Sequence, residues 1–193
     1  MTTLAEKNCL DNAAKWNSMH TEKGRVERTF GEHFHEFEGA NILDAGCSVG
    51  FTTLEIGGRS RNSTVTGLED NYICNLFGDQ LINSRNVGVR FRRGNFYKLD
   101  ELFLPEDLDA IFAMNNLVPC STSNLTFRQQ EAIARNFNTC LVEGGELYLS
   151  SLRNFAILSK KGDKFLEKEV VGDFRDSDCY GHLQEIYGIE CYT

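Results

Sequence analysis

The sequence has few features that would place the protein in a membrane or at a metal ion. Only two of its 193 residues are proline, and its strongly apolar runs are no longer than a β-strand, too short to span a bilayer. Its seven cysteines are scattered without a Cys-x-x-Cys pair, which supports neither a zinc site nor a disulfide framework. The first residues include Glu6 and Lys7 and lack an apolar core, so we expect no signal peptide and a cytoplasmic location.

The chain is also poor in positive charge. Its 20 Lys and Arg face 28 Asp and Glu, a formal net charge of −8, whereas proteins that bind long nucleic acids carry basic stripes. Arg90 and Arg92 are interpreted as the solvated edge of a sheet. The lysines of the C-terminal region are interpreted as solvated surface: Lys160, Lys161, Lys164 and Lys168. The charge therefore favours a small molecule or a protein as partner over a nucleic acid.

Residues 41–50, Asn-Ile-Leu-Asp-Ala-Gly-Cys-Ser-Val-Gly, are the most informative stretch. An apolar run ends in Asp44 and leads into a loop with Gly46 and Gly50, and the residues that follow keep a helical rhythm. This pattern predicts a strand, a tight turn and a helix, an arrangement that binds nucleotides beyond the carboxyl ends of strands in a doubly wound sheet. The dinucleotide fingerprint Gly-x-Gly-x-x-Gly does not fit, because the spacing is Asp44-x-Gly46-x-Ser48-x-Gly50.

Two further strands are predicted to end in polar residues at the same edge. A β-rich run over residues 64–68 ends in Glu69 and Asp70, and Glu69 lies 25 positions after Asp44. That is close to the offset of about 20 residues at which a βαβ unit presents a carboxylate to a ribose diol. A third strand over residues 87–92 runs into Gly94-Asn95-Phe96.

The second half of the chain continues this alternation. Leu108–Met114 is a buried-strand candidate that leads to Asn115, and residues 127–141 keep an apolar face at helical spacing. Glu143-Gly144-Gly145 is expected to end that helix, and residues 146–151 alternate as a fifth strand.

These landmarks, in this order, resemble the class I S-adenosylmethionine-dependent methyltransferases. The resemblance implies that S-adenosylmethionine is the cofactor and that it lies at the carboxyl ends of the first four strands. It also implies which residues hold the methionine end, the ribose and the adenine. The implied cofactor-binding residues are Asp44, Gly46, Cys47, Ser48, Gly50, Glu69, Asp70, Asn95, Phe96 and Asn115.

The resemblance further implies an α/β fold: a single Rossmann-like, doubly wound domain with a mostly parallel sheet and an antiparallel C-terminal hairpin. We expect residues 1–40 to form a helical lid segment, residues 41–151 the cofactor-binding core, and residues 152–193 the last strands of the same domain. Residues 167–171 and 185–192 are predicted as the sixth and seventh strands.

In the lid segment, an apolar stripe is expected to pack on the sheet, and two further side chains are candidates for lining the pocket. The stripe consists of Val26, Phe30, Phe34 and Phe37, and the pocket candidates are Trp16 and His20. His33 and His35 lack partner ligands nearby in the sequence and are interpreted as surface histidines rather than as a metal site.

The catalytic residues and the acceptor stay open at this level. Residues 116–119, Asn-Leu-Val-Pro, lack the double proline and the aromatic residue typical of adenine and glutamine amino-methyltransferases. His182 is a candidate base, with an exposed loop histidine as the alternative. The function expected is methyl transfer to a small molecule or a protein; the alternatives are aminopropyl transfer and a non-catalytic, methyltransferase-like binding subunit. With no inserted substrate domain, the acceptor pocket is expected to be shallow or completed by a second subunit in a homodimer.

Overall fold

A computed structural model describes most of the chain: residues 7, 11, 24–72, 74–76, 78–79, 88–114, 126–151, 154–172 and 184–190. No helix within these residues is long and apolar enough to cross a membrane.

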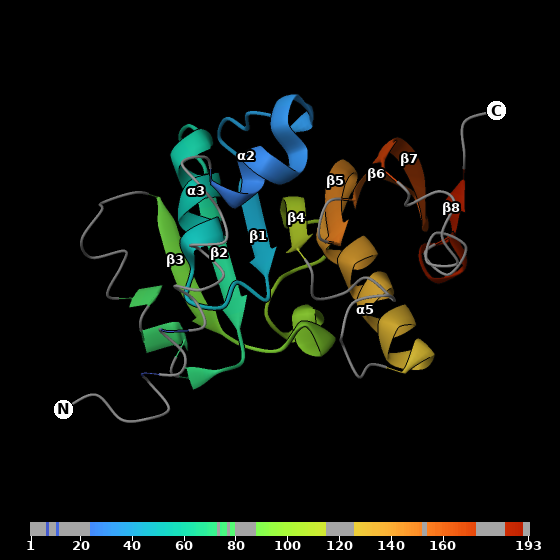
Figure 1. Cartoon of the computed structure of the whole chain (residues 1–193). Coiled ribbons are helices and arrows are strands. Elements are labelled where there is room, and N and C mark those ends of the chain that lie inside the picture. Colours follow the sequence, from blue (N-terminus) through green and yellow to red (C-terminus); the bar gives the residue numbers. More distant parts are fainter. Residues whose placement is uncertain are drawn as a thin grey trace.

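One mixed sheet organises the described part of the chain (Figure 1). Its eight strands lie in the order β3-β2-β1-β4-β5-β6-β7-β8. The first five pair in parallel, β6 is antiparallel to both β5 and β7, and β8 is parallel to β7. The strands are β1 (Asn41–Ala45), β2 (Thr64–Glu69), β3 (Val89–Arg93), β4 (Leu108–Met114), β5 (Leu141–Ser151), β6 (Asn154–Lys161), β7 (Lys164–Val171) and β8 (Ile189–Glu190). The predicted α/β fold with a mostly parallel sheet and an antiparallel hairpin near the C-terminus is confirmed.

Helices cover both faces of the sheet. They are α2 (Arg25–Phe30), the 3-10 helix η1 (Gly31–His33), α3 (Phe51–Arg59), the 3-10 helix η2 (Phe96–Glu101) and α5 (Phe127–Cys140), with helical turns also among residues 72–79. Alternating strand residues supply two apolar cores, because successive side chains of a strand point to opposite faces. Leu43 of β1 packs in the core that includes α5, whereas Ile42 packs in the core that includes α2 and α3.

The aromatic stripe of the N-terminal segment packs on the sheet, as predicted. Val26, Phe30 and Phe34 are buried, and Phe37 is partly buried against the same core. Phe30 meets the ring of Phe155 on β6 edge-to-face, with the ring centroids 5.1 Å apart. This packing fixes α2 on the sheet through residues far apart in the sequence.

The C-terminal hairpin differs from the prediction. It is formed by β6 and β7, whereas residues 184–187 are helical and only Ile189–Glu190 continue as the short strand β8. Residues 167–171 do lie in a strand, but their antiparallel partner precedes them in the chain. The turn between β6 and β7 contains Gly162 at φ +60°, and Gly-Asp is a typical two-residue hairpin turn.

The interpretation of the C-terminal lysines as solvated surface is wrong for Lys160. Because β6 is an internal strand, the Lys160 side chain is only 7% exposed, and its ammonium group donates to the carbonyl oxygen of Leu141 at 2.7 Å. Lys168 on β7 forms an ion pair with the buried Glu146. The interpretation of Arg90 and Arg92 is confirmed, since both are exposed on β3, at the edge of the sheet.

Candidate cofactor site

The glycine loop between β1 and α3 folds back over the end of β2. The amides of Gly46 and Cys47 both donate to the carbonyl oxygen of Leu68, at 2.8 and 3.1 Å. Gly46, Ser48 and Gly50 all have positive φ, of 76°, 53° and 90°, which glycine adopts readily. The three positions that the sequence singled out therefore shape one tight turn.

The Cys47 side chain lies beneath this loop. It is buried, and a Cβ atom added to Gly67 of β2 would come within 2.9 Å of its sulfur. Burial raises the pKa of the thiol well above its ordinary value, so the sulfur is neutral.

Asp44 is a buried carboxylate at the carboxyl end of β1. It is 2% exposed and accepts a hydrogen bond from the Thr53 hydroxyl of α3 at 2.7 Å. Burial raises its pKa to about 6, although the Thr53 hydrogen bond and the charge of Arg25 both act in the opposite direction. A carboxylate that is this poorly solvated suits a cationic ligand group, which would restore the balance of charge.

Glu69 connects the end of β2 to the glycine loop. Its carboxylate accepts from the amide of Ser48 at 2.9 Å and from the amide of Asn71 at 3.1 Å. Burial and a hydrogen bond with Asp70 contribute to raising its pKa, and Asp70 itself is exposed. An ionised carboxylate offers about four acceptor positions, and the two amides and Asp70 occupy at most three of them, so capacity is left for a ribose hydroxyl.

Asn95 and Phe96 follow β3 at the same edge of the sheet. The Asn95 amide oxygen accepts from the amide of Tyr97 at 3.0 Å and so caps η2. This oxygen has a second lone pair, which fits the predicted contact with an adenine amino group. Phe96 is partly buried against the core on the α5 side. Other predicted residues lie outside the described part of the chain: Asn115, Trp16, His20 and His182.

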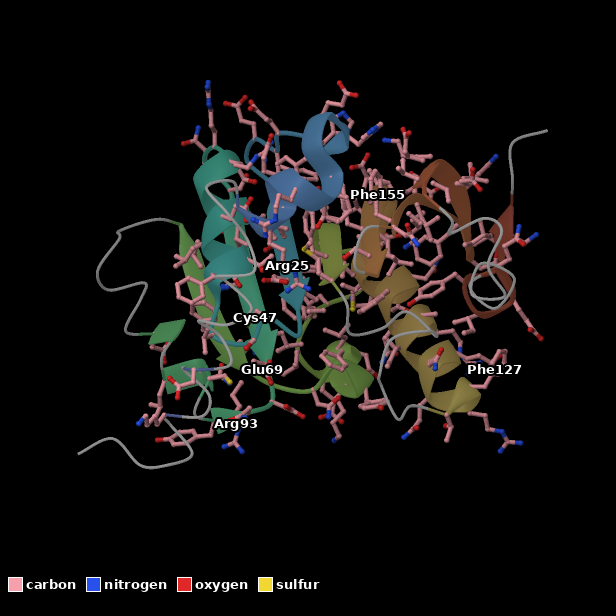
Figure 2. All side chains as sticks on the ribbon, in the orientation of Figure 1. Arg25, Cys47, Glu69, Arg93, Phe127 and Phe155 are labelled. Carbon is pink, nitrogen blue, oxygen red and sulfur yellow. The ribbon has the colours of Figure 1, made fainter. Side chains whose placement is uncertain are left out.

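Arg25 is a residue of this site that the sequence did not indicate. It reaches from α2 to the end of β4, where its guanidinium donates to the carbonyl oxygen of Met114 at 3.1 Å. Met114 lies two residues beyond Phe112, which is paired in register with Asp44 on β1. Figure 2 shows Arg25, Cys47 and Glu69 following one another along this part of the molecule. Arg25 acts across the tertiary fold, so no local pattern in the sequence could have identified it.

Glu55 of α3 holds the helix that carries Arg25. Its two carboxylate oxygens accept from the amides of Val26 and Glu27, at 3.0 and 2.9 Å, and so satisfy the first turn of α2. The carboxylate also packs against Gly24, where an added Cβ atom would lie only 2.2 Å from the Glu55 carboxyl carbon. Glu27 in turn forms an ion pair with Arg59 of α3.

Phe91 of β3 explains why three glycines surround it. A Cβ atom added at Gly50, Gly67 or Gly78 would lie 1.8, 2.6 or 2.7 Å from the nearest atom of its ring. Gly50 therefore serves two purposes, since it also adopts the positive φ that begins α3.

Solved structures decide which fold this is. One match is a geranyl diphosphate C-methyltransferase from Streptomyces coelicolor in complex with Mg²⁺, geranyl diphosphate and S-adenosyl-L-homocysteine, with a TM-score of 0.53 and 20% identity. It covers 75% of this chain and 49% of that one. The chain has the class I methyltransferase fold.

Two further solved structures match this chain to a similar extent. A complex of the Haloferax volcanii Trm112 methyltransferase activator with a putative methyltransferase gives a TM-score of 0.56 at 15% identity, covering 77% of this chain and 60% of that one. The [4+2]-cyclase SpnF gives 0.51 at 22% identity, covering 64% and 41%. The chain thus spans about half the length of the structures it matches. No protein-family model and no curated protein sequence matches it.

Within this methyltransferase fold, the predicted site residues that lie in the described part of the chain gather at the carboxyl ends of neighbouring strands. Asp44 and Glu69 lie at the carboxyl ends of β1 and β2, and Asn95 follows β3. Arg25 approaches from α2 and contacts the end of β4. Among the described residues, no group of three or more His, Cys, Asp and Glu side chains could hold a metal ion. His33 and His35 instead lie near Glu169 and Glu146, at 3.2 and 3.3 Å.

Proposed function

We propose that this protein binds S-adenosylmethionine and transfers its methyl group to a small molecule or a protein. The observation that carries the proposal is the hydrogen bond from the Ser48 amide to the Glu69 carboxylate. This bond joins the glycine loop to the end of β2, so that the loop, Asp44 and Glu69 form one continuous polar edge. The methyltransferase fold supports the same cofactor.

The residues present fit the chemistry of this cofactor. Asp44 is a buried carboxylate matched to a cationic amino-acid end, and the glycine loop that follows it exposes Ser48. Glu69 has acceptor capacity for a ribose diol, and the Asn95 oxygen has it for an adenine amino group. When bound, the cofactor supplies a methyl group on a positively charged sulfur.

The contribution of the chain to methyl transfer is then binding and orientation. Holding the acceptor in line with the methyl group accounts for much of the acceleration of such displacements. A general base is needed only for an acceptor that must lose a proton. The net charge of −8 supports a small molecule or a protein as acceptor rather than a nucleic acid.

Calorimetric titration with S-adenosylhomocysteine tests the cofactor. The informative variant is Glu69→Gln, which keeps an acceptor oxygen for the loop amides but loses the charge that the ribose contact uses. We expect the wild type to bind and this variant to bind about ten- to a hundredfold more weakly. Glu36→Gln, the same change at an exposed residue that precedes β1, is the matched control and should change affinity much less.

Binding alone does not distinguish methyl transfer from other uses of the fold, since one of the matching structures is that of a [4+2]-cyclase. The second measurement is therefore turnover of S-adenosylmethionine with candidate small-molecule and protein acceptors. S-adenosylhomocysteine as the product supports methyl transfer, whereas methylthioadenosine would indicate transfer of the amino-acid side. A wild-type protein that binds neither S-adenosylmethionine nor S-adenosylhomocysteine contradicts the proposal.

A further inference from the structure

The strongest feature not explained by the fold alone is a positive charge placed beside the buried Asp44. Arg25 is partly buried, and the carbonyl oxygen of Met114 is its one hydrogen-bond partner among the described residues. A guanidinium carries five N–H donors in a planar fork, which suits a carboxylate better than a single carbonyl. Most of its donor capacity is therefore not used by the described part of the chain.

Arg25 and Asp44 attract each other without forming a direct ion pair. Each influences the pKa of the other, yet the one described hydrogen-bond partner of Asp44 is Thr53, and that of Arg25 is Met114. Two separated opposite charges at neighbouring strand ends match a zwitterion, whose ammonium and carboxylate groups carry the complementary pair. An amino acid is such a zwitterion.

We propose that Arg25 is a specificity-determining residue that binds the carboxylate at the amino-acid end of the cofactor, and that Glu55 is its positioning residue. The inference rests on the proposed function and deepens it. It assigns the ligand class as S-adenosyl compounds that keep their α-carboxylate. Decarboxylated S-adenosylmethionine, the donor used in aminopropyl transfer, lacks the group that Arg25 recognises.

Glu55 acts through the backbone of α2. This helix has only six residues and no side-chain cap of its own, so the two hydrogen bonds from Val26 and Glu27 to Glu55 replace the missing cap. Glu55 lies one turn after Phe51, the first residue of α3. The helix that follows the glycine loop therefore fixes the position of Arg25 through Glu55. Helix α3 thereby contacts both ends of the proposed zwitterion site, since its Thr53 also donates to Asp44.

The test compares two ligands that differ only in the carboxylate: S-adenosylhomocysteine and its decarboxylated analogue. Both are titrated calorimetrically into the wild type and into Arg25→Met, which keeps an unbranched apolar side chain and removes the guanidinium group with its charge. We expect the wild type to prefer S-adenosylhomocysteine by about tenfold or more. Arg25→Met should bind the two ligands nearly equally, with affinity for the decarboxylated analogue changed by less than about threefold. Thermal melting confirms that the variant is folded.

Two further variants separate recognition from structure. Arg25→Lys keeps the charge and should retain part of the preference for the carboxylated ligand. Glu55→Gln should reduce the preference of the wild type, and it should have no further effect on the preference once Arg25 is replaced by Met. A structural role alone would lower affinity for both ligands alike and leave their ratio unchanged.

The outcomes separate this inference from the proposed function. If the wild type binds S-adenosylhomocysteine but Arg25→Met weakens both ligands equally, Arg25 is structural and the inference is overturned while the cofactor proposal stands. A wild-type preference for the decarboxylated ligand also overturns the inference and favours aminopropyl transfer. If the wild type binds neither ligand, the proposed function fails and the inference fails with it.

Discussion

Replacing Asp44 with Asn should stabilise the fold above pH 6 while it weakens the cofactor site. Folding raises the pKa of this carboxyl from its ordinary 3.8 to about 6, mainly because burial disfavours the charged form. Each unit of pKa corresponds to about 1.4 kcal/mol, so the ionised carboxylate costs the fold roughly 3 kcal/mol. Asn is neutral at every pH and can still accept the Thr53 hydroxyl through its amide oxygen.

The direction of the pH dependence is set by which state of the chain, folded or unfolded, binds the Asp44 proton more tightly. Below about pH 4 Asp44 is protonated in both the folded and the unfolded chain, so Asp and Asn should give similar stabilities. Between about pH 4 and 6 the unfolded chain releases the proton while the folded chain retains it, and the wild type loses stability. Above pH 6 the loss is complete.

Urea denaturation at pH 5 to 8 measures this difference. The free energy of unfolding of Asp44→Asn should exceed that of the wild type by up to about 3 kcal/mol at pH 8, and by less toward pH 5. Asp79→Asn, at an exposed position, is the control and should show no such trend. In the same samples Asp44→Asn should bind S-adenosylhomocysteine at least about tenfold more weakly at pH 8. A variant that is less stable than the wild type by the same amount at every pH would refute the reasoning.

Three further changes test the packing and the polar contacts. Gly50→Ala should lower the free energy of unfolding by about 3 kcal/mol or more, because φ is +90° and the new methyl group would lie 1.8 Å from the Phe91 ring. Adding Phe91→Ala to this variant should restore part of the lost stability, as measured by denaturation. Lys160→Met should cost about 1–3 kcal/mol, since it leaves the Leu141 carbonyl without its donor, and a neutral result in urea would contradict a structural role for this buried lysine. Asn95→Asp keeps an acceptor for both the η2 cap and an adenine amino group, so this variant should bind S-adenosylhomocysteine at least as tightly as the wild type. Asn95→Ala should bind it more weakly. A lower affinity of Asn95→Asp would count against the adenine role.

The sequence indicated much of the site because its central elements are local. Asp44, Gly46 and Gly50 lie close together in the sequence, in one strand–turn–helix unit, so that a local pattern shows them. Glu69 follows the next strand of the same βαβ unit, and parallel strands bring their carboxyl ends to one edge. Their proximity could therefore be predicted without knowledge of the tertiary structure.

Strand β6 was missed because its lysines were interpreted as solvated surface. Lysine is usually a surface residue, but the strand of Lys160 lies between β5 and β7. The carbonyl oxygen of Leu141 accepts a hydrogen bond from the buried ammonium group. The Gly162-Asp163 pair did carry a hairpin signal, with the continuous apolar run Phe155–Leu158 on its N-terminal side. Giving that turn more weight than the lysines would have located β6.

Arg25 and Glu55 mark a different limit of sequence reasoning. A helix cap is normally recognised because the capping residue immediately precedes the helix, but the cap of α2 is a glutamate from α3, far along the chain. Only the packed structure shows that this glutamate holds α2 and thereby places the Arg25 guanidinium at the end of β4. The local glycine loop shapes the site, and long-range contacts of this kind set its charges. We therefore expect substitutions in the loop to affect binding of all adenosyl ligands, whereas substitutions of Arg25 and Glu55 should change which of them is preferred.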